Sequence, residues 1–327
     1  MKHKTILPVA ASKELGERKP IRVCFDESYI VLFRTSQGIS AFLDACPHRG
    51  VPLSKGCVKE GNIKCIYHGW QFNDKGALVN IPGDPNFKPY SSPLLTLFYA
   101  KEYDGLIWLS RNKFSCSELF TPMLPSTHEH ATVVKKINAN KIEIAENFLD
   151  ALHTHSIHTG IIRSAKLKNR CTVTVQNVID GYEASYIEDR QQTGILSRLF
   201  GSQITKGIGR IRQPGIIELE YITAGNEIEM SVVIYIIEER DGVCKLILRT
   251  YLKKSKVPFI VKALLLAPFQ LLVLHQDKKV LELQHRALTE NPDFKPIVRK
   301  TDIMRRYIEK TYEGTIEECN VKLEIML

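Results

Sequence analysis

The sequence predicts an α+β protein. An all-β domain, residues 1–115, precedes a mixed domain, residues 116–327, in which helices flank a large antiparallel sheet. Three observations support this prediction. Short alternating apolar segments and turn residues fill the first part, a Pro/Ser-rich passage at 115–130 marks a boundary, and longer alternating segments followed by helical periodicity fill the second part. A chain of 327 residues can build a sizeable core in each domain.

The strands expected in the first domain follow one another closely. Thr-Ser-Gln-Gly at 35–38 separates two of them, and Asn-Asp-Lys-Gly at 73–76 closes a hairpin, because glycine, asparagine and aspartate favour turns. The metal-ligand residue types of this domain fall on the loops. The expected strands cover residues 21–25, 27–34, 39–45, 62–72, 77–81 and 103–110.

The second domain alternates over longer segments, which is typical of an antiparallel sheet. A helix is expected to begin within 141–155, and helical periodicity returns at 270–290 and 300–311. No internal repeat or low-complexity tract interrupts the pattern. The expected strands cover residues 171–179, 182–188, 215–223, 227–239 and 243–253.

One apolar segment, residues 259–275, requires a separate decision. It contains Lys262, Pro268 and Gln270, and it is shorter than the roughly twenty apolar residues of a membrane-spanning helix. The sequence favours a buried helix pair bent at Pro268. Contact with a membrane surface is the alternative.

Composition is that of a globular protein, with 44% hydrophobic and 25% charged residues. The net charge of +9 is dispersed and forms no compact basic block, so no nucleic-acid partner is predicted, and a basic surface equally suits an acidic redox protein. Eight cysteines are spread along a long chain, unlike a disulfide framework, and the apolar run near the amino terminus is too short for a secretion signal. A cytoplasmic location is therefore expected.

The stretch ACPHRGVPLSKGCVKEGNIKCIYHGW, residues 45–70, contains two pairs of metal ligands. Cys46-x-His48 is followed, after sixteen residues, by Cys65-x-x-His68. Two thiolates and two imidazoles suit either a tetrahedral zinc site or a Rieske [2Fe-2S] cluster, in which two histidines bind one of the irons. The short Cys-x-His spacing favours the cluster.

Both half-motifs and their flanking residues resemble the Rieske motif. The resemblance implies that Cys46 and Cys65 bind one iron while His48 and His68 bind the other. Val51 and Tyr67 stand where respiratory-chain Rieske proteins carry two further cysteines, so the match is with Rieske ferredoxins and ring-hydroxylating oxygenases. Cys57 is outside the ligand positions and is expected to be an ordinary loop thiol.

Beyond the boundary, ENFLDALHTHSIHTG, residues 146–160, spaces an aspartate and two histidines as Asp-x2-His-x4-His. On a regular helix, His153 and His158 would be about 500° apart in rotation, so they could not share one metal. We therefore expect a helix break or π-bulge between them. His155 is expected to point elsewhere.

This spacing, with Asn147 three residues before Asp150, resembles the mononuclear-iron motif of Rieske non-haem iron oxygenases. A two-histidine-one-carboxylate site also needs an acid. Asp241, Asp277, Glu282 and Glu290 are candidates, and the family resemblance of residues 274–284 selects Asp277.

The resemblance also implies a role for Asp150. In the family this carboxylate bridges a cluster histidine and an iron-binding histidine of the neighbouring subunit in a trimer, here His68 and His153. Asp150 and Asn147 are thus the expected catalytic residues, while His153, His158 and Asp277 are the expected iron ligands.

Taken together, the motifs predict a Rieske oxygenase of the ring-hydroxylating α-subunit-like family, in its mono-oxygenase or demethylase branch. The resemblance implies a [2Fe-2S] cluster, a mononuclear Fe(II), O₂, an apolar and cyclic small-molecule substrate, and a homotrimer. Electrons are expected from a separate NAD(P)H-dependent reductase, directly or through a ferredoxin, because no flavin or dinucleotide motif is visible. A cis-dihydroxylating dioxygenase, or a redox-transfer or sensing protein with an inactive second site, are the alternatives.

Overall fold

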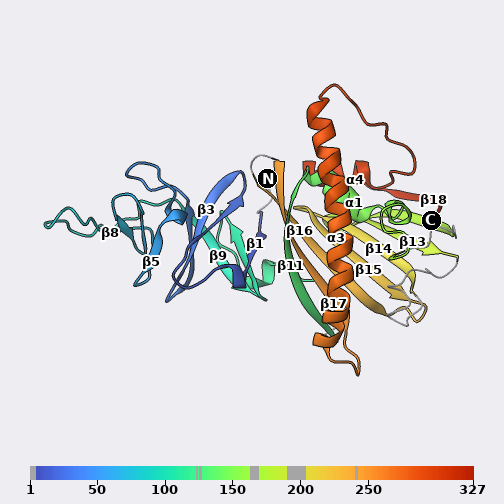
Figure 1. Ribbon diagram of the computed structural model, residues 1–327, viewed down its shortest axis with the longest axis horizontal. Helices are drawn as coiled ribbons and strands as arrows, with labels where there is room; N and C mark the ends of the chain where they lie inside the picture. Colours follow the sequence, from blue (N-terminus) through green and yellow to red (C-terminus); the bar gives the residue numbers. More distant parts are fainter. Residues whose placement is uncertain (1–4, 123, 125–126, 163–168, 190–203, 240–241) are drawn as a thin grey trace. The chain divides into compact units, whose positions relative to one another are not determined.

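The computed structural model describes residues 5–122, 124, 127–162, 169–189, 204–239 and 242–327. The chain forms two compact units. Unit 1 comprises Met1–Thr121 with Ile237–Asp241, and unit 2 comprises Pro122–Ile236 with Gly242–Leu327. Figure 1 shows that strands alone make up the regular structure of unit 1 apart from short turns, whereas unit 2 combines a large sheet with helices.

Unit 1 contains two antiparallel sheets. One has six strands in the order β1-β10-β9-β4-β3-β2, and the other has four in the order β5-β6-β7-β8. The predicted hairpin around 73–76 is the pairing of β7 with β8. The strands are β1 (Leu7–Ala11), β2 (Ile21–Phe25), β3 (Ser28–Thr35), β4 (Gly38–Leu43), β5 (Cys57–Lys59), β6 (Asn62–Lys64), β7 (Gln71–Phe72), β8 (Leu78–Asn80), β9 (Leu97–Tyr103) and β10 (Leu106–Ser110).

Two hydrophobic clusters fill unit 1. Strand β3 supplies both, because its successive side chains point to opposite faces of the sheet: Ile30 and Leu32 enter one cluster, Val31 and Phe33 the other. The second cluster also contains the two predicted ligand cysteines. The cysteine loops are therefore built onto a packed core, which fixes their positions.

Unit 2 is built on an eight-stranded antiparallel sheet in the order β11-β17-β16-β15-β14-β13-β12-β18. This confirms the predicted fold class. The strands β11, β14 and β18 were not predicted, since β14 contains two glycines and the other two are rich in charged residues. The strands are β11 (His128–Asn138), β12 (Arg170–Val178), β13 (Gly181–Glu188), β14 (Ile204–Arg212), β15 (Ile216–Thr223), β16 (Ile228–Glu238), β17 (Val243–Lys253) and β18 (Asn320–Met326).

Among the described residues, three helices pack with this sheet: α1 (Lys141–Leu149), α3 (Phe259–Glu290) and α4 (Arg305–Glu313). Figure 1 shows α3 running across the sheet. Buried residues of all three helices, including Ile144, Leu274 and Ile308, join the sheet in one hydrophobic core.

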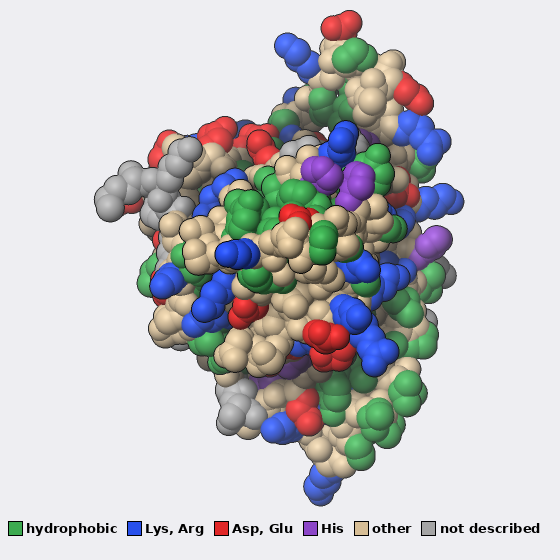
Figure 2. Space-filling model, turned by 90° about the vertical axis from the view of Figure 1, so that its left-hand side faces the viewer, with side chains coloured by type: hydrophobic (Ala, Val, Ile, Leu, Met, Phe, Trp, Pro, Cys, Tyr) green, Lys and Arg blue, Asp and Glu red, His purple; other side chains and the backbone are tan. Residues whose placement is uncertain are grey.

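The prediction of a buried, bent helix pair at 259–275 is wrong. Helix α3 is a single element of 32 residues that contains Pro268, and many apolar side chains of its amino-terminal half are exposed. By length and composition alone, α3 is the one helix among the described residues that could cross a membrane. In Figure 2, hydrophobic side chains gather at the lower right, where the amino-terminal half of α3 lies.

We expect the buried Asp44 carboxylate to stabilise unit 1. It accepts a charged hydrogen bond from Arg22 at 2.6 Å and hydrogen bonds from the Ser54 backbone N–H at 2.7 Å and the Ser54 hydroxyl at 2.6 Å. Asp44→Ala leaves these donors without their acceptor, so the free energy of unfolding should fall by about 1–3 kcal/mol. Urea unfolding monitored by fluorescence measures the change.

Arg111→Ala is the matched control, because it removes an ion pair with Asp26 in which both side chains are about half exposed. Its cost should be about 0–1 kcal/mol. Equal losses in the two variants would contradict a stabilising role for the buried carboxylate.

Candidate metal centres and substrate pocket

The first centre is formed by two loops of unit 1 with the same backbone hydrogen bonds. The Cys46 N–H donates to Val51 O at 2.9 Å, and the Gly50 N–H donates to Cys46 O at 2.8 Å. In the second loop the Cys65 N–H donates to Trp70 O at 2.9 Å, and the Gly69 N–H donates to Cys65 O.

A glycine is required at the same place in both loops. Gly50 and Gly69 adopt φ values of +71° and +70°, a left-handed conformation that other residues rarely take. The two halves of the motif are thus equivalent turns that present their side chains to each other.

The side chains divide into an inner and an outer pair. Cys46 and Cys65 are both 3% exposed, whereas the rings of His48 and His68 lie further out with their centroids 4.6 Å apart. Trp70 stacks on His48 at 4.5 Å, which fixes the orientation of that ring. Two buried sulfurs beneath two imidazoles fit a Rieske cluster, which needs thiolates on one iron and imidazoles on the other.

Burial shifts the pKa of a cysteine thiol in this centre. Burial raises the pKa of the Cys46 thiol, the adjacent Cys65 also raises it and backbone hydrogen bonds lower it, so the pKa is about 11. The thiolate that a cluster requires therefore depends on the positive charge of bound iron. Cys57, predicted to lie on a loop, is exposed on strand β5.

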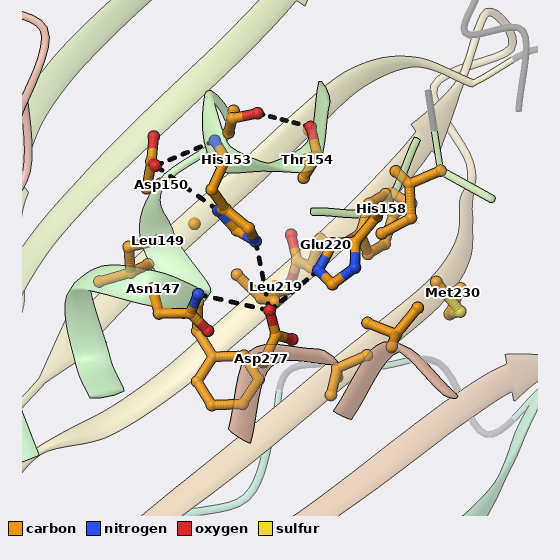
Figure 3. Close-up of a pocket in the computed structure, with 18 of the residues that line it drawn as sticks. Asn147, Leu149, Asp150, His153, Thr154, His158, Leu219, Glu220, Met230 and Asp277 are labelled. Carbon is orange, nitrogen blue, oxygen red and sulfur yellow. Dashed lines mark hydrogen bonds and ion pairs between the residues drawn. The ribbon is translucent and has the colours of Figure 1, made fainter. Parts of the chain in front are cut away.

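The second centre begins where α1 ends. The helix stops at Leu149, and the Asp150 side chain accepts hydrogen bonds from the backbone N–H groups of Leu152 at 2.7 Å and His153 at 3.1 Å. A single short 3₁₀ turn, His153–His155, follows. The α-helix therefore ends before both histidines and not between them, as was predicted, so the two do not lie on one regular helix; Figure 3 shows the turn above the pocket.

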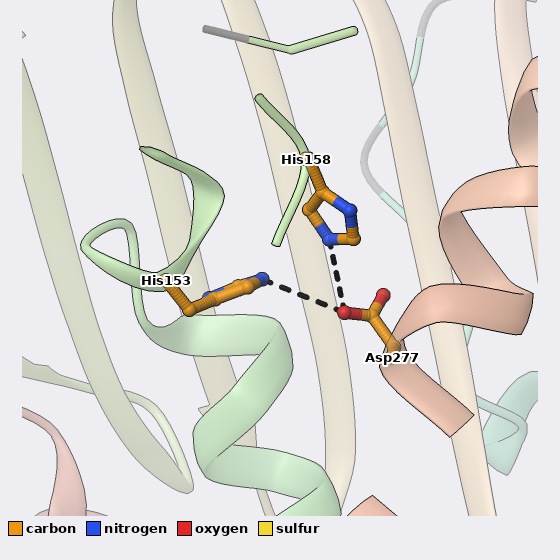
Figure 4. Close-up of side chains that lie close together, drawn as sticks. All are labelled: His153, His158 and Asp277. Carbon is orange, nitrogen blue, oxygen red and sulfur yellow. Dashed lines mark ion pairs between the residues drawn. The ribbon is translucent and has the colours of Figure 1, made fainter. Parts of the chain in front are cut away.

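The turn brings both histidines to one carboxylate of α3. His158 Nε2 is 2.9 Å from Asp277 Oδ1, and His153 Nε2 is 3.7 Å from the same oxygen. One donor atom of each residue lies within 4.8 Å of the other two, so the three could hold a metal ion (Figure 4). His155 is not part of this group, as expected.

Neighbouring groups orient each donor. His158 Nδ1 lies 2.9 Å from Gln276 Oε1, which makes Nδ1 the protonated nitrogen and leaves Nε2 for the metal. His153 Nδ1 faces Asp150 Oδ2 at 3.5 Å, and the Asn147 amide N–H donates to Asp277 Oδ1 at 3.4 Å.

The buried carboxylate needs a positive charge close to it. Burial lowers the pKa of His158, but the hydrogen bond to Asp277 and its negative charge outweigh burial, so the pKa is raised. Asp277 is 3% exposed, and such a buried anion is costly unless a proton or a cation compensates it. The donor set of two imidazoles and one carboxylate suits a mononuclear Fe(II) with open positions.

The other candidate acids are elsewhere. Glu282 accepts a hydrogen bond from the Asn138 N–H and pairs with Lys278, and Glu290 is the last residue of α3. Asp241 lies outside the described residues.

A cavity of about 220 Å³ opens beside the triad (Figure 3). The strands of the sheet and α3 line it, and most of its lining is apolar, for example Leu219, Val232 and Leu248. Glu220 is a polar exception, and Arg210 Nη1 holds its carboxylate at 2.8 Å.

Sequence reasoning missed three residues of this region. Gln276 adjoins Asp277, so its position beside the ligand was visible in the sequence. Tyr186 donates its hydroxyl to Leu149 O at 2.8 Å and so fixes the end of α1, and burial raises its pKa. Neither Tyr186 nor Glu220 carries a local signal, because each is one of many tyrosines or glutamates on strands.

Gln276 should act as a positioning residue for His158. Gln276→Leu keeps the volume but removes the acceptor for Nδ1–H, so Fe(II) affinity should fall about 10–100-fold. Gln276→Glu retains an acceptor oxygen and should restore the affinity. Anaerobic Fe(II) titration measures the change.

Gln284→Leu, an exposed glutamine two turns further along α3, is the control and should bind Fe(II) like the wild type. An unchanged affinity in Gln276→Leu would show that the glutamine does not orient the ring.

The sequence of this chain is similar to that of known proteins. Residues 5–91 match the Rieske [2Fe-2S] domain. A 3-chlorobenzoate-3,4-dioxygenase oxygenase subunit of Comamonas testosteroni is 29% identical over 166 residues, 47% of this chain and 37% of that protein. A putative toluene-4-sulfonate monooxygenase iron-sulfur subunit, TsaM2, of the same organism is 34% identical over 160 residues, 46% of each protein. The chain thus matches less than two thirds of the length of these relatives.

Solved structures share the fold over almost the whole chain. Dicamba monooxygenase bound to dicamba superposes with a TM-score of 0.78 at 20% identity, covering 95% of this chain and 96% of that chain. NdmA of Pseudomonas putida CBB5 with caffeine superposes with a TM-score of 0.73 at 20% identity, covering 93% and 88%. Residues 5–91 thus form a Rieske [2Fe-2S] domain, and the chain is similar in sequence to oxygenase subunits and in fold to dicamba monooxygenase and NdmA.

Proposed function

We propose that this protein is a Rieske oxygenase that uses O₂ and external electrons to hydroxylate or oxidatively demethylate an apolar ring compound. One observation carries the proposal: a two-histidine-one-carboxylate group opens onto an apolar cavity in a chain that also presents paired Cys-His loops. When bound, the cluster supplies single electrons and the Fe(II) activates O₂.

The residues of the second centre have separate tasks. His153, His158 and Asp277 hold the metal from one side. The apolar lining excludes water and holds a substrate by shape, which keeps the reacting region dry. Asp150 accepts the His153 backbone N–H and faces its ring, so it controls the orientation of that imidazole.

The size and chemistry of the cavity favour the mono-oxygenase branch. Dicamba and caffeine, the molecules held by the two solved relatives, are small rings with a methyl group on oxygen or nitrogen. A cavity of about 220 Å³ with a mostly apolar lining is consistent with a compound of this kind. A cis-dihydroxylating dioxygenase is the second candidate, because the matched Comamonas subunit belongs to a dioxygenase.

The proposal includes partners and a location. We propose a homotrimer in which Asp150 links His153 to His68 of a neighbouring copy, and a separate NAD(P)H-dependent reductase, directly or through a ferredoxin. We propose a cytoplasmic location, because eight cysteines spread along a long chain do not resemble a disulfide framework.

Iron content tests both metal centres. The wild type should hold about three irons per chain, two in the cluster and one mononuclear. Cys65→Ser should lose the cluster and keep about one iron, and Asp277→Ala should lose the mononuclear iron and keep about two. Iron analysis with electron paramagnetic resonance distinguishes them.

Cys57→Ser is the control for general damage from cysteine replacement, because Cys57 is exposed and outside the loops. Loss of the cluster in this variant, or no mononuclear ferrous signal in the wild type, would contradict the assignment.

Asp150→Asn tests the proposed bridge. Both metals should remain bound, because no metal ligand changes, while turnover falls by about 10–100-fold or more through loss of the carboxylate that orients His153. Asp293→Asn, an exposed aspartate beyond α3, should turn over like the wild type. O₂ uptake with a surrogate reductase measures the rates, and wild-type turnover in Asp150→Asn would refute the bridge.

The reaction type follows from labelled oxygen. A screen of methoxylated and N-methylated ring compounds for O₂ uptake should identify a substrate, and turnover under ¹⁸O₂ should place one labelled atom in the product. Two labelled atoms would favour the dioxygenase. O₂ uptake that is uncoupled from any product across the screen would count against both.

A further inference from the structure

One face of α3 is apolar and exposed, although the helix packs with the sheet of unit 2 and carries Asp277. Ile260 and Leu264 are 68% and 69% exposed, and Leu265 is 59% exposed. Because these positions recur every three or four residues, they form one stripe. We call this stripe the α3 apolar face; it comprises Ile260, Val261, Leu264, Leu265, Leu271 and Leu272, and the exposed Val257 lies just before the helix.

Positive charge borders the α3 apolar face. Lys253, Lys254 and Lys256 precede the helix and Lys262 lies within it, while residues 253–276 contain no aspartate or glutamate. Among nearby acids, Glu227 pairs with Lys253 at 2.6 Å. The stretch therefore joins a large apolar surface to an excess of lysines.

The opposite side of α3 packs against the rest of unit 2. Leu274, Asp277 and Leu281 are buried, and Leu266 and Gln270 line the cavity. A helix that crossed a bilayer would have to leave the sheet and separate Asp277 from His158. The α3 apolar face can therefore meet lipid only by lying along the membrane surface.

We propose that the α3 apolar face docks this protein on the surface of an anionic lipid bilayer. The leucines and isoleucines enter the boundary between headgroups and acyl chains, to a depth of about 5–10 Å. The lysines at the amino-terminal end of the helix meet anionic headgroups. An apolar protein partner would cover the stripe but gain nothing from the lysines, whereas an anionic bilayer matches both features.

Vesicle flotation with the full chain and its metals tests the proposal. The wild type should bind vesicles of phosphatidylcholine and phosphatidylserine at least about tenfold more strongly than vesicles of phosphatidylcholine alone, since each lysine near an anionic surface adds attraction. High salt should reduce the difference. Binding that does not depend on anionic lipid would overturn the electrostatic part of the proposal, and no binding would overturn it entirely.

Two variants separate the contributions. Leu264→Glu with Leu265→Glu should reduce binding to anionic vesicles at least about tenfold, because it places carboxylates in the inserted stripe. Lys254→Glu with Lys256→Glu should reduce binding to anionic vesicles and leave binding to neutral vesicles unchanged. Leu283→Glu, an exposed leucine near the other end of the same helix, is the matched control and should bind like the wild type.

The variants also distinguish lipid from a second copy of the chain. Light scattering should give the same mass for the wild type and for Leu264→Glu with Leu265→Glu, and iron content should be equal, which shows that the fold is intact. A smaller mass in the leucine variant would assign the stripe to self-association and overturn the proposal. Equal vesicle binding by the leucine variant and Leu283→Glu would overturn it as well.

Discussion

The arrangement of unit 2 depends on one buried carboxylate. Asp277 is 3% exposed, and its Oδ1 is shared by His158 at 2.9 Å and, more distantly, by His153 at 3.7 Å. A buried anion is tolerated only with compensating charge, so this site is stable when a proton or a cation lies between the carboxylate and the imidazoles. Two segments far apart in the sequence, 153–158 and the part of α3 around Asp277, have to meet for this to happen.

Several features of the fold position the two histidines and Asp277 next to one another. Helix α1 ends at Leu149, where Tyr186 of the sheet binds the last carbonyl group, and the Asp150 side chain holds the following turn. Helix α3 packs across the sheet so that Gln276 and Asp277 both face His158. The sheet beneath them supplies an apolar cavity, and the polar triad at its edge is the place where a substrate would meet the metal.

The two centres differ in which of their ligand residues are buried. In unit 1 the thiols are buried, whereas His48 is partly exposed and His68 is exposed. In unit 2 His158 and Asp277 are buried, and all three donors line the apolar cavity. Helix α3 has two different sides, since one carries Asp277 of the possible metal site while the other exposes apolar residues.

The sequence by itself determined the parts of this protein that depend on local spacing. Cys46-x-His48 and Cys65-x-x-His68 needed only two equivalent turns, and the five-residue interval between His153 and His158 excluded one regular helix through both, which the structure bears out. The strands of 171–253 could be predicted from side-chain alternation. The exception is β14, because its two glycines interrupt the alternating pattern.

Tertiary structure decided what depends on packing between distant segments. The choice of Asp277 over Glu282 rested on resemblance until α3 was placed against α1, because a helix presents acids on several faces and only packing selects one. The exposure of α3 was mispredicted for the same reason. Apolar composition shows that a helix can be buried, but only the positions of its neighbours decide which side is covered.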